Sequence, residues 1–82
     1  MHIAICDDEK QDRQRIVDWL REDQTLQAVL TTYNSTAALL LDIQRGQRYD
    51  LIFLDIELPG DINGMEAARR IRQRDSQVMQ VF

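Results

Sequence analysis

Residues 50–60 read DLIFLDIELPG, and this stretch restricts the possible folds more than any other in the chain. Four apolar residues, Leu51 to Leu54, precede Asp55 with no polar residue between them. An apolar run without alternation, bounded by polar residues and Pro-Gly, is typical of a strand buried on both faces. Such strands belong to parallel sheets covered by helices, and ligands bind beyond their carboxyl ends. Asp55 is therefore either the solvent-facing end of a strand or a functional group.

A second short apolar run, Ile3 to Cys6, also ends in acidic residues. We predict a strand over His2–Cys6, followed directly by Asp7, Asp8 and Glu9, and then a helix from about Lys10 to Asp23. Acidic residues at a helix N-terminus cap free N–H groups and favour the helix dipole. A purely structural role for Asp7 and Asp8 therefore stays open at this point.

The remaining elements alternate in type along the chain. A strand over 28–33 is less apolar than the other two, which favours a position at the edge of the sheet. We further predict a helix over 37–45 capped by Asn34-Ser35 and closed by Gly46, a loop over 59–64, a helix over 65–74 and a strand over 78–82. In the last of these helices Met65, Ala68 and Ile71 lie near one face.

Strands that alternate with helices require parallel pairing and right-handed crossovers. Because the third strand is the most apolar and the second the least, we predict an α/β, doubly wound sheet of order 2-1-3-4. The topological switch point then lies between the first and third strands, whose carboxyl ends carry Asp7, Asp8 and Asp55.

Three carboxylates at adjacent strand ends imply a cation. Neighbouring strands lie about 4.8 Å apart, and unit charges at that distance repel by roughly 4 kcal/mol per pair at an effective dielectric near 20. Mg²⁺ removes this repulsion, and it favours one or two carboxylates together with waters and phosphate oxygens. The sequence therefore predicts a Mg²⁺ site at which a carboxylate can accept a phosphoryl group.

Composition and charge restrict the binding partners and the cellular location that we expect for the chain. The 82 residues make at most one small domain, and the net charge of −4 argues against a nucleic-acid surface. Cys6 is the only cysteine and lies in an apolar run, so we expect a buried thiol and a reducing compartment. The chain shows neither a membrane span nor a signal-peptide pattern, which favours a cytoplasmic location. The four arginines between Arg69 and Arg74 fit a solvated helix face, and Glu66 can pair with the first two.

Three segments together resemble a known family. IAICDDE at 3–9, LIFLDIELPG at 51–60 and NGMEAARRIR at 63–72 are similar to the receiver domain of bacterial two-component response regulators. In general character the sequence resembles the receivers of regulators that carry a LytTR-type DNA-binding domain. The resemblance extends over all 82 residues. It implies a flavodoxin-like fold and a signalling module of a phosphorelay that is not itself an enzyme.

The resemblance also implies roles for individual residues. Asp55 would be the phosphoacceptor, and Asp8 would bind Mg²⁺ directly, with Asp7 acting mainly through water. Asp55 and the backbone carbonyl of Glu57 would complete the protein ligands of the metal, and Pro59 would shape the loop. A sensor histidine kinase would donate the phosphoryl group, and an output domain would receive the signal. The resemblance to LytTR-type regulators implies that this output domain regulates transcription.

The sequence departs from the family in two respects. The loop from Asp55 to Gly64, where the glycine permits the turn into the next helix, is one residue longer than the usual receiver spacing. The family's Thr or Ser after strand four, its Lys after strand five, and its last helices and strand would lie beyond Phe82. We therefore expect residues 1–82 to be the N-terminal part of a single receiver domain. Poor phosphotransfer and self-association through the edge of the fourth strand would follow.

Two alternatives remain open. A haloacid-dehalogenase-like phosphatase also has an aspartate after an apolar strand and a second acid two residues later, as in Asp55-Ile56-Glu57. That family requires Asp at the second position and a nearby Thr, and it leaves Asp7 and Asp8 unexplained. The other alternative is a receiver-like interaction module that acts without phosphorylation.

Overall fold

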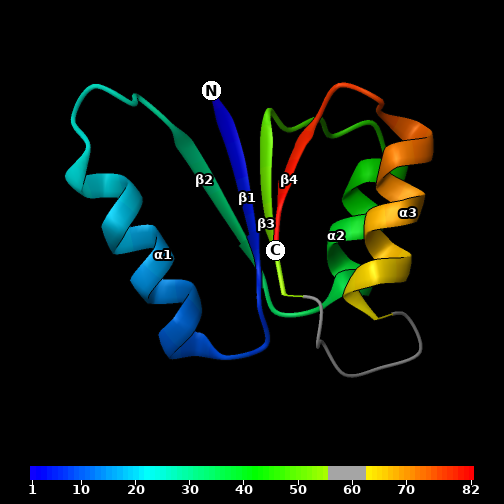
Figure 1. The fold of residues 1–82 in the computed structure, drawn as a ribbon, viewed down its shortest axis with the longest axis horizontal. Helices are drawn as coiled ribbons and strands as arrows, with labels where there is room; N and C mark the ends of the chain where they lie inside the picture. Colours follow the sequence, from blue (N-terminus) through cyan, green and yellow to red (C-terminus); the bar gives the residue numbers. More distant parts are fainter. Residues whose placement is uncertain (56–62) are drawn as a thin grey trace.

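Four parallel strands pair in the order β2-β1-β3-β4, as the sequence predicted. The computed structural model describes residues 1–55 and 63–82. The strands are β1 (His2–Cys6), β2 (Val29–Tyr33), β3 (Leu51–Leu54) and β4 (Met79–Val81). In the described residues, a helix lies between each strand and the next strand along the chain. The fold is therefore an α/β, doubly wound sheet (Figure 1).

The helices cover the two faces of the sheet unequally. α1 (Lys10–Glu22) lies on one face, and α2 (Thr36–Gln44) and α3 (Gly64–Arg74) lie side by side on the other (Figure 1). Side chains alternate along β3, so Ile52 and Leu54 point toward the two-helix face and are 1% and 2% exposed. Leu51 and Phe53 point toward α1 and are only half-buried. The prediction of a strand buried on both faces is therefore fulfilled on one face only.

Local capping residues set where α2 and α3 begin. Ser35 Oγ accepts a hydrogen bond from the Ala38 amide at 3.2 Å. Asn63 Oδ1 accepts one from the Glu66 amide at 2.9 Å. At the other end of α2, Gly46 has φ +102°, a conformation that side chains with a Cβ rarely adopt, so a glycine closes the helix as predicted.

Element boundaries differ from the sequence predictions by one or two residues. Residues 28, 78 and 82 lie outside the strands, because only 29–33 and 79–81 pair with a neighbour. Of the three residues expected near one face of α3, Ala68 and Ile71 are buried, together with Ala67, whereas Met65 is 59% exposed. Trp19 flanks the core rather than entering it, with its ring packed edge-to-face on Phe53 at a centroid distance of 6.4 Å.

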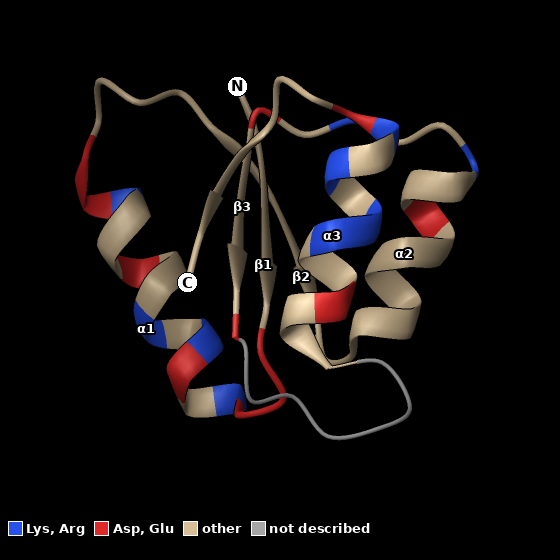
Figure 2. Ribbon diagram, turned by 45° about the vertical axis from the view of Figure 1, so that its right-hand side comes forward, with Lys and Arg blue, Asp and Glu red and all other residues tan. Residues whose placement is uncertain are grey.

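Basic and acidic residues are mixed along α1, whereas other parts of the chain carry mainly one sign of charge. Figure 2 shows the arginines of α3, with Glu66 among them, and the acidic residues at the carboxyl ends of β1 and β3. Glu66 accepts hydrogen bonds from Arg69 at 2.6 and 2.9 Å and from Arg70 at 3.1 Å, which lower the pKa of its carboxyl to about 2. The arginines of α3 are exposed, as expected for a solvated face. Among the described residues, no helix is long and apolar enough to cross a membrane.

Candidate metal centre

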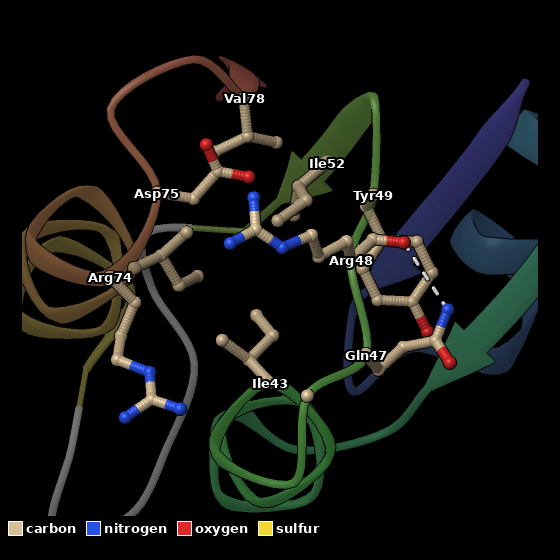
Figure 3. Close-up of a pocket in the computed structure, with 10 residues that line it drawn as sticks. Ile43, Gln47, Arg48, Tyr49, Ile52, Arg74, Asp75 and Val78 are labelled. Carbon is tan, nitrogen blue, oxygen red and sulfur yellow. Dashed lines mark hydrogen bonds between the residues drawn. The ribbon is translucent and has the colours of Figure 1, made fainter.

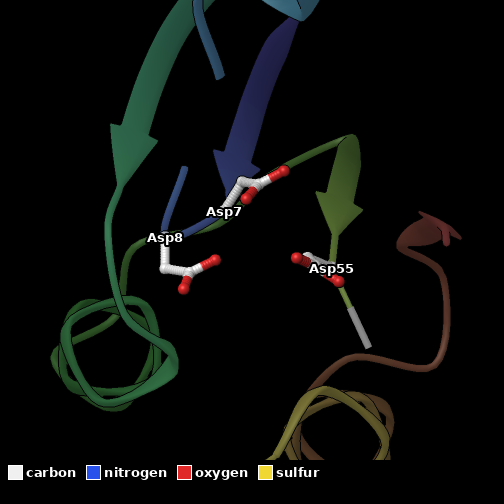
Figure 4. A group of neighbouring side chains, drawn as sticks. All are labelled: Asp7, Asp8 and Asp55. Atoms are coloured by element: carbon white, nitrogen blue, oxygen red, sulfur yellow. The ribbon is translucent and has the colours of Figure 1, made fainter. Parts of the chain in front are cut away.

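Three carboxylates meet at the switch point between β1 and β3. Register pairs Cys6 with Leu54, so the residues that follow them, Asp7 and Asp55, leave the sheet side by side. Asp8 lies one residue further along the turn into α1. One carboxylate oxygen from each of the three residues lies within 4.8 Å of the others, and Figure 4 shows Asp8 and Asp55 pointing toward each other. The structure thus brings together the three acidic side chains that the sequence singled out.

Backbone hydrogen bonds hold these residues in place. The Asp7 amide donates to the Tyr33 carbonyl at 3.1 Å, and the Asp55 amide donates to the Cys6 carbonyl at 3.0 Å, so both extend the sheet ladder by one residue. The Asp7 side chain turns back to its own loop, where Oδ1 accepts a hydrogen bond from the Glu9 amide at 2.9 Å. This bond stabilises the turn before α1 and is not a helix cap, since the N-cap residue of α1, Glu9, makes no side-chain capping hydrogen bond. It leaves the second oxygen of Asp7 for other contacts.

The site is electrostatically strained around Asp7. This residue is 9% exposed, and its burial raises the pKa of the carboxyl; the Glu9 amide lowers that pKa, and the charges of Asp55, Asp12 and Asp8 raise it again. The neighbouring Cys6 thiol is buried, and its burial, helped by the charges of Asp7 and Asp55, raises its pKa to about 12. Cys6 is therefore an inert neighbour of the acidic site at neutral pH, as its sequence context predicted.

An open depression of about 440 Å³ leads to the carboxylates. Asp7 and Asp55 line it together with Asp12 of α1, and Ile16 and Phe53 form part of an apolar wall. Asp12 was not among the site residues predicted from the sequence. The signal that points to it is positional, because the first turn of a helix after a switch-point strand faces the same crevice.

A second cavity lies at the opposite end of the strands. It has a volume of about 70 Å³ and lies beside the segment that precedes β3 (Figure 3). Ile43, Ile52, Ile71 and Val78 form its apolar wall, and Arg48 extends into it (Figure 3). A dry cavity of about 150 Å³ binds benzene, so this one, at about half that volume, is too small for an organic cofactor. Its lining includes Asp75 but none of Asp7, Asp8 and Asp55.

Two residues of the expected site, Glu57 and Pro59, lie outside the described residues. The three carboxylates alone provide the hard oxygen donors that Mg²⁺ prefers. A bound cation would also offset the repulsion between their negative charges. The donor set of Asp7, Asp8 and Asp55 therefore fits a magnesium ion.

This combination defines a class of protein: a doubly wound α/β domain with a cluster of carboxylates in the crevice at its switch point. The family model of the response regulator receiver domain matches residues 3–82, and the chain belongs to that family. Proteins of this family are signalling modules of two-component systems. No curated protein sequence matches the chain.

Solved structures of response regulators share the fold. TrrA of Thermotoga maritima, solved in complex with Mg²⁺-BeF, is 32% identical, with a TM-score of 0.82 over 96% of this chain and 64% of its own. The N-terminal domain of a response regulator/sensory box/GGDEF protein from Carboxydothermus hydrogenoformans is 26% identical, with a TM-score of 0.84 over 100% and 62%. RcsB of Salmonella typhimurium, at 17% identity, has a TM-score of 0.84 over 99% and 41% and is similar in fold alone. The chain thus spans less than two thirds of the length of each of these three proteins.

Proposed function

We propose that this chain is the phosphoacceptor part of a two-component response regulator, with Asp55 as the residue that is phosphorylated. The observation that carries the proposal is the convergence of Asp7, Asp8 and Asp55 to within 4.8 Å at the switch point. Support comes from the family match, and from a 32% identical relative that was solved with Mg²⁺-BeF.

The proposed reaction is a phosphoryl transfer to a carboxylate. A carboxylate oxygen of Asp55 attacks the phosphorus of a phosphohistidine on a sensor kinase, and a P–O bond forms while the P–N bond breaks. The electron pair of the broken bond stays on the imidazole nitrogen. Asp7, Asp8 and the Glu57 carbonyl would hold the metal, and Mg²⁺, when bound, neutralises charge on the transferring group.

The same proposal covers location and partners. The sensor histidine kinase is the donor, and the signal passes to an output domain, for which we propose the LytTR DNA-binding type. The chain itself makes no direct contact with nucleic acid or membrane in this account, and it acts in the cytoplasm. Residues 1–82 act as part of one receiver domain.

Covalent labelling tests the phosphoacceptor. The chain is incubated with acetyl phosphate and Mg²⁺, and the site of modification is located by mass spectrometry. We expect slow labelling of Asp55 that requires Mg²⁺ and disappears in Asp55→Asn. Asp50→Asn is the matched control, because Asp50 stands at the other end of β3 and accepts a hydrogen bond from the His2 amide at 2.7 Å.

Two outcomes would contradict this function. Labelling that is absent, independent of Mg²⁺ or located on another residue would favour the interaction module that acts without phosphorylation. Continuous release of phosphate from a generic monoester, lost in Asp55→Asn, would favour the phosphatase instead.

A further inference from the structure

Arg13 is the one Lys or Arg residue of the chain that is partly buried. All ten Lys and Arg residues lie in the described part of the chain, and the other nine are exposed, whereas Arg13 is half-buried. Its guanidinium reaches back from the first turn of α1, where Nη1 donates a hydrogen bond to the Asp7 carbonyl at 2.7 Å. Burying part of an arginine is costly unless it gains a strong hydrogen bond, and this short, charge-assisted bond is one.

This bond completes a three-point attachment of Asp7. The amide of Asp7 is bonded to Tyr33 of β2, its carboxylate is bonded to the Glu9 amide, and its carbonyl is bonded to Arg13. The carbonyl belongs to the peptide that joins Asp7 to Asp8, so fixing it also fixes where the Asp8 side chain leaves the backbone. Both carboxylates that face Asp55 therefore depend on the orientation of this one peptide.

We propose that Arg13 is a positioning residue of the acidic site, which holds the peptide between Asp7 and Asp8 so that both carboxylates face Asp55. The inference rests on the proposed function of that site as a Mg²⁺ centre. Arg13 would be needed for high Mg²⁺ affinity although its hydrogen bond is to a backbone carbonyl and, among the described residues, it forms no ion pair with a carboxylate.

Charge and positioning predict effects of opposite sign. Arg13 carries a positive charge, so its removal should strengthen the binding of a cation nearby if charge alone mattered. If Arg13 acts by holding the peptide, its removal should weaken binding, because the carboxylates lose the arrangement that suits the metal. The direction of the change in Mg²⁺ affinity thus separates the two roles.

The test compares Arg13→Met, Arg13→Lys and Arg15→Met by calorimetric titration with Mg²⁺. Methionine keeps an apolar stem of similar length but cannot bond the Asp7 carbonyl, and lysine keeps one donor. Arg15, two residues further along α1, is exposed, with only a 3.8 Å ion pair to Asp12, so its variant removes charge without touching the turn. Each titration is run at a temperature at which thermal unfolding shows that variant to be folded.

We expect Arg13→Met to weaken Mg²⁺ binding about tenfold, the lower end of the effect of residues behind a metal ligand. Arg13→Lys should restore part of the affinity, and Arg15→Met should leave it unchanged or slightly stronger. Unchanged or tighter binding by Arg13→Met would overturn the proposal.

A second measurement distinguishes a failure of the positioning role of Arg13 from a failure of the proposed Mg²⁺ site. If the unaltered chain binds no Mg²⁺, the proposed metal site fails, and hydrogen exchange of the Glu9 amide then decides the role of Arg13. That amide is bonded to Asp7 Oδ1, so it should exchange several-fold faster in Arg13→Met if Arg13 holds the turn. An unchanged exchange rate would overturn the positioning role.

Discussion

Asp7 combines a structural and an electrostatic role in one side chain. Its Oδ1 accepts the hydrogen bond of the Glu9 amide and so shapes the turn into α1. The same carboxylate is 9% exposed and lies beside the charges of Asp55 and Asp8. The carboxylate that stabilises the turn is therefore a largely buried negative charge. Binding of either a proton or a metal ion would lower the energy of that charge.

The raised pKa of Asp7 predicts a pH-dependent stability in the absence of metal. Because the folded pKa lies above the unfolded value near 3.8, the stabilisation is complete below that value and is lost as pH rises through the folded pKa. Asp7→Asn should remove this dependence and, at neutral pH, stabilise the metal-free chain by about 1 kcal/mol, a fraction of the Coulomb energy because water screens the site.

Denaturant unfolding with and without the substitution, from pH 4 to pH 8 in a chelating buffer, measures the difference. The difference is the relevant quantity, because other carboxyls such as Glu66 have lowered pKa values and act in the opposite direction. A variant less stable than the parent at neutral pH would show that the Glu9 hydrogen bond outweighs the repulsion.

Cys6 gives a second prediction at the residue scale. Its thiol is 1% exposed and has a pKa of about 12, raised by burial and by the charges of Asp7 and Asp55. A thiol reagent at pH 8 should therefore label the folded chain at least tenfold more slowly than the chain in denaturant. Equal rates would mean that β1 opens readily in the folded state.

At the scale of elements, capping chemistry determines how the two-helix face is assembled. α2 begins where Ser35 accepts the Ala38 amide, and four of its residues are buried against the sheet and α3: Thr36, Leu39, Leu40 and Ile43. Ser35→Ala should lower the free energy of unfolding by about 1 kcal/mol, the usual value of a helix N-cap. Ser76→Ala, in the exposed turn before β4, is the control and should change little. Equal losses in both variants would argue against capping.

Strand positions were predictable because their signal is local, whereas burial on each face was not. Apolar runs marked β1 and β3 within a residue, since four consecutive apolar side chains suit a central strand. The half-exposed state of Phe53 depends on how much of its face α1 covers, which no local pattern encodes. The exposure of Met65 could not be predicted for a similar reason, because spacing defines a face of a helix but not which residues of that face reach the core.

The acidic site shows the same division. Asp7, Asp8 and Asp55 could be predicted as neighbours because strand order alone places the ends of β1 and β3 side by side. Asp12 and Arg13 could not, since their roles depend on where the first turn of α1 lies relative to the crevice and on one side-chain rotamer.

At the scale of the whole molecule, the α1 face and the β4 edge carry the large apolar side chains that are most exposed among the described residues. Trp19, Met79 and Phe82 are each 63% exposed, and β4 pairs on one side only among the described residues. An open strand edge next to apolar side chains favours pairing with a second copy. We predict concentration-dependent self-association, which Val81→Lys in β4 should weaken because charge on an edge strand opposes pairing. Sedimentation showing a monomer at all concentrations for the unaltered chain would contradict this prediction.

The central claim is that three carboxylates at the switch point form a Mg²⁺ site, and thermal unfolding with and without Mg²⁺ tests it most directly. Binding at ten times the dissociation constant should stabilise the chain by about 1.4 kcal/mol, and each kcal/mol corresponds to roughly 4–8 °C in a domain of this size. Asp55→Asn should be more stable than the parent without metal and respond less to Mg²⁺, whereas Asp50→Asn should respond as the parent does. If Mg²⁺ leaves the midpoint unchanged and Asp55→Asn is destabilised without it, these carboxylates serve only as caps and strand ends.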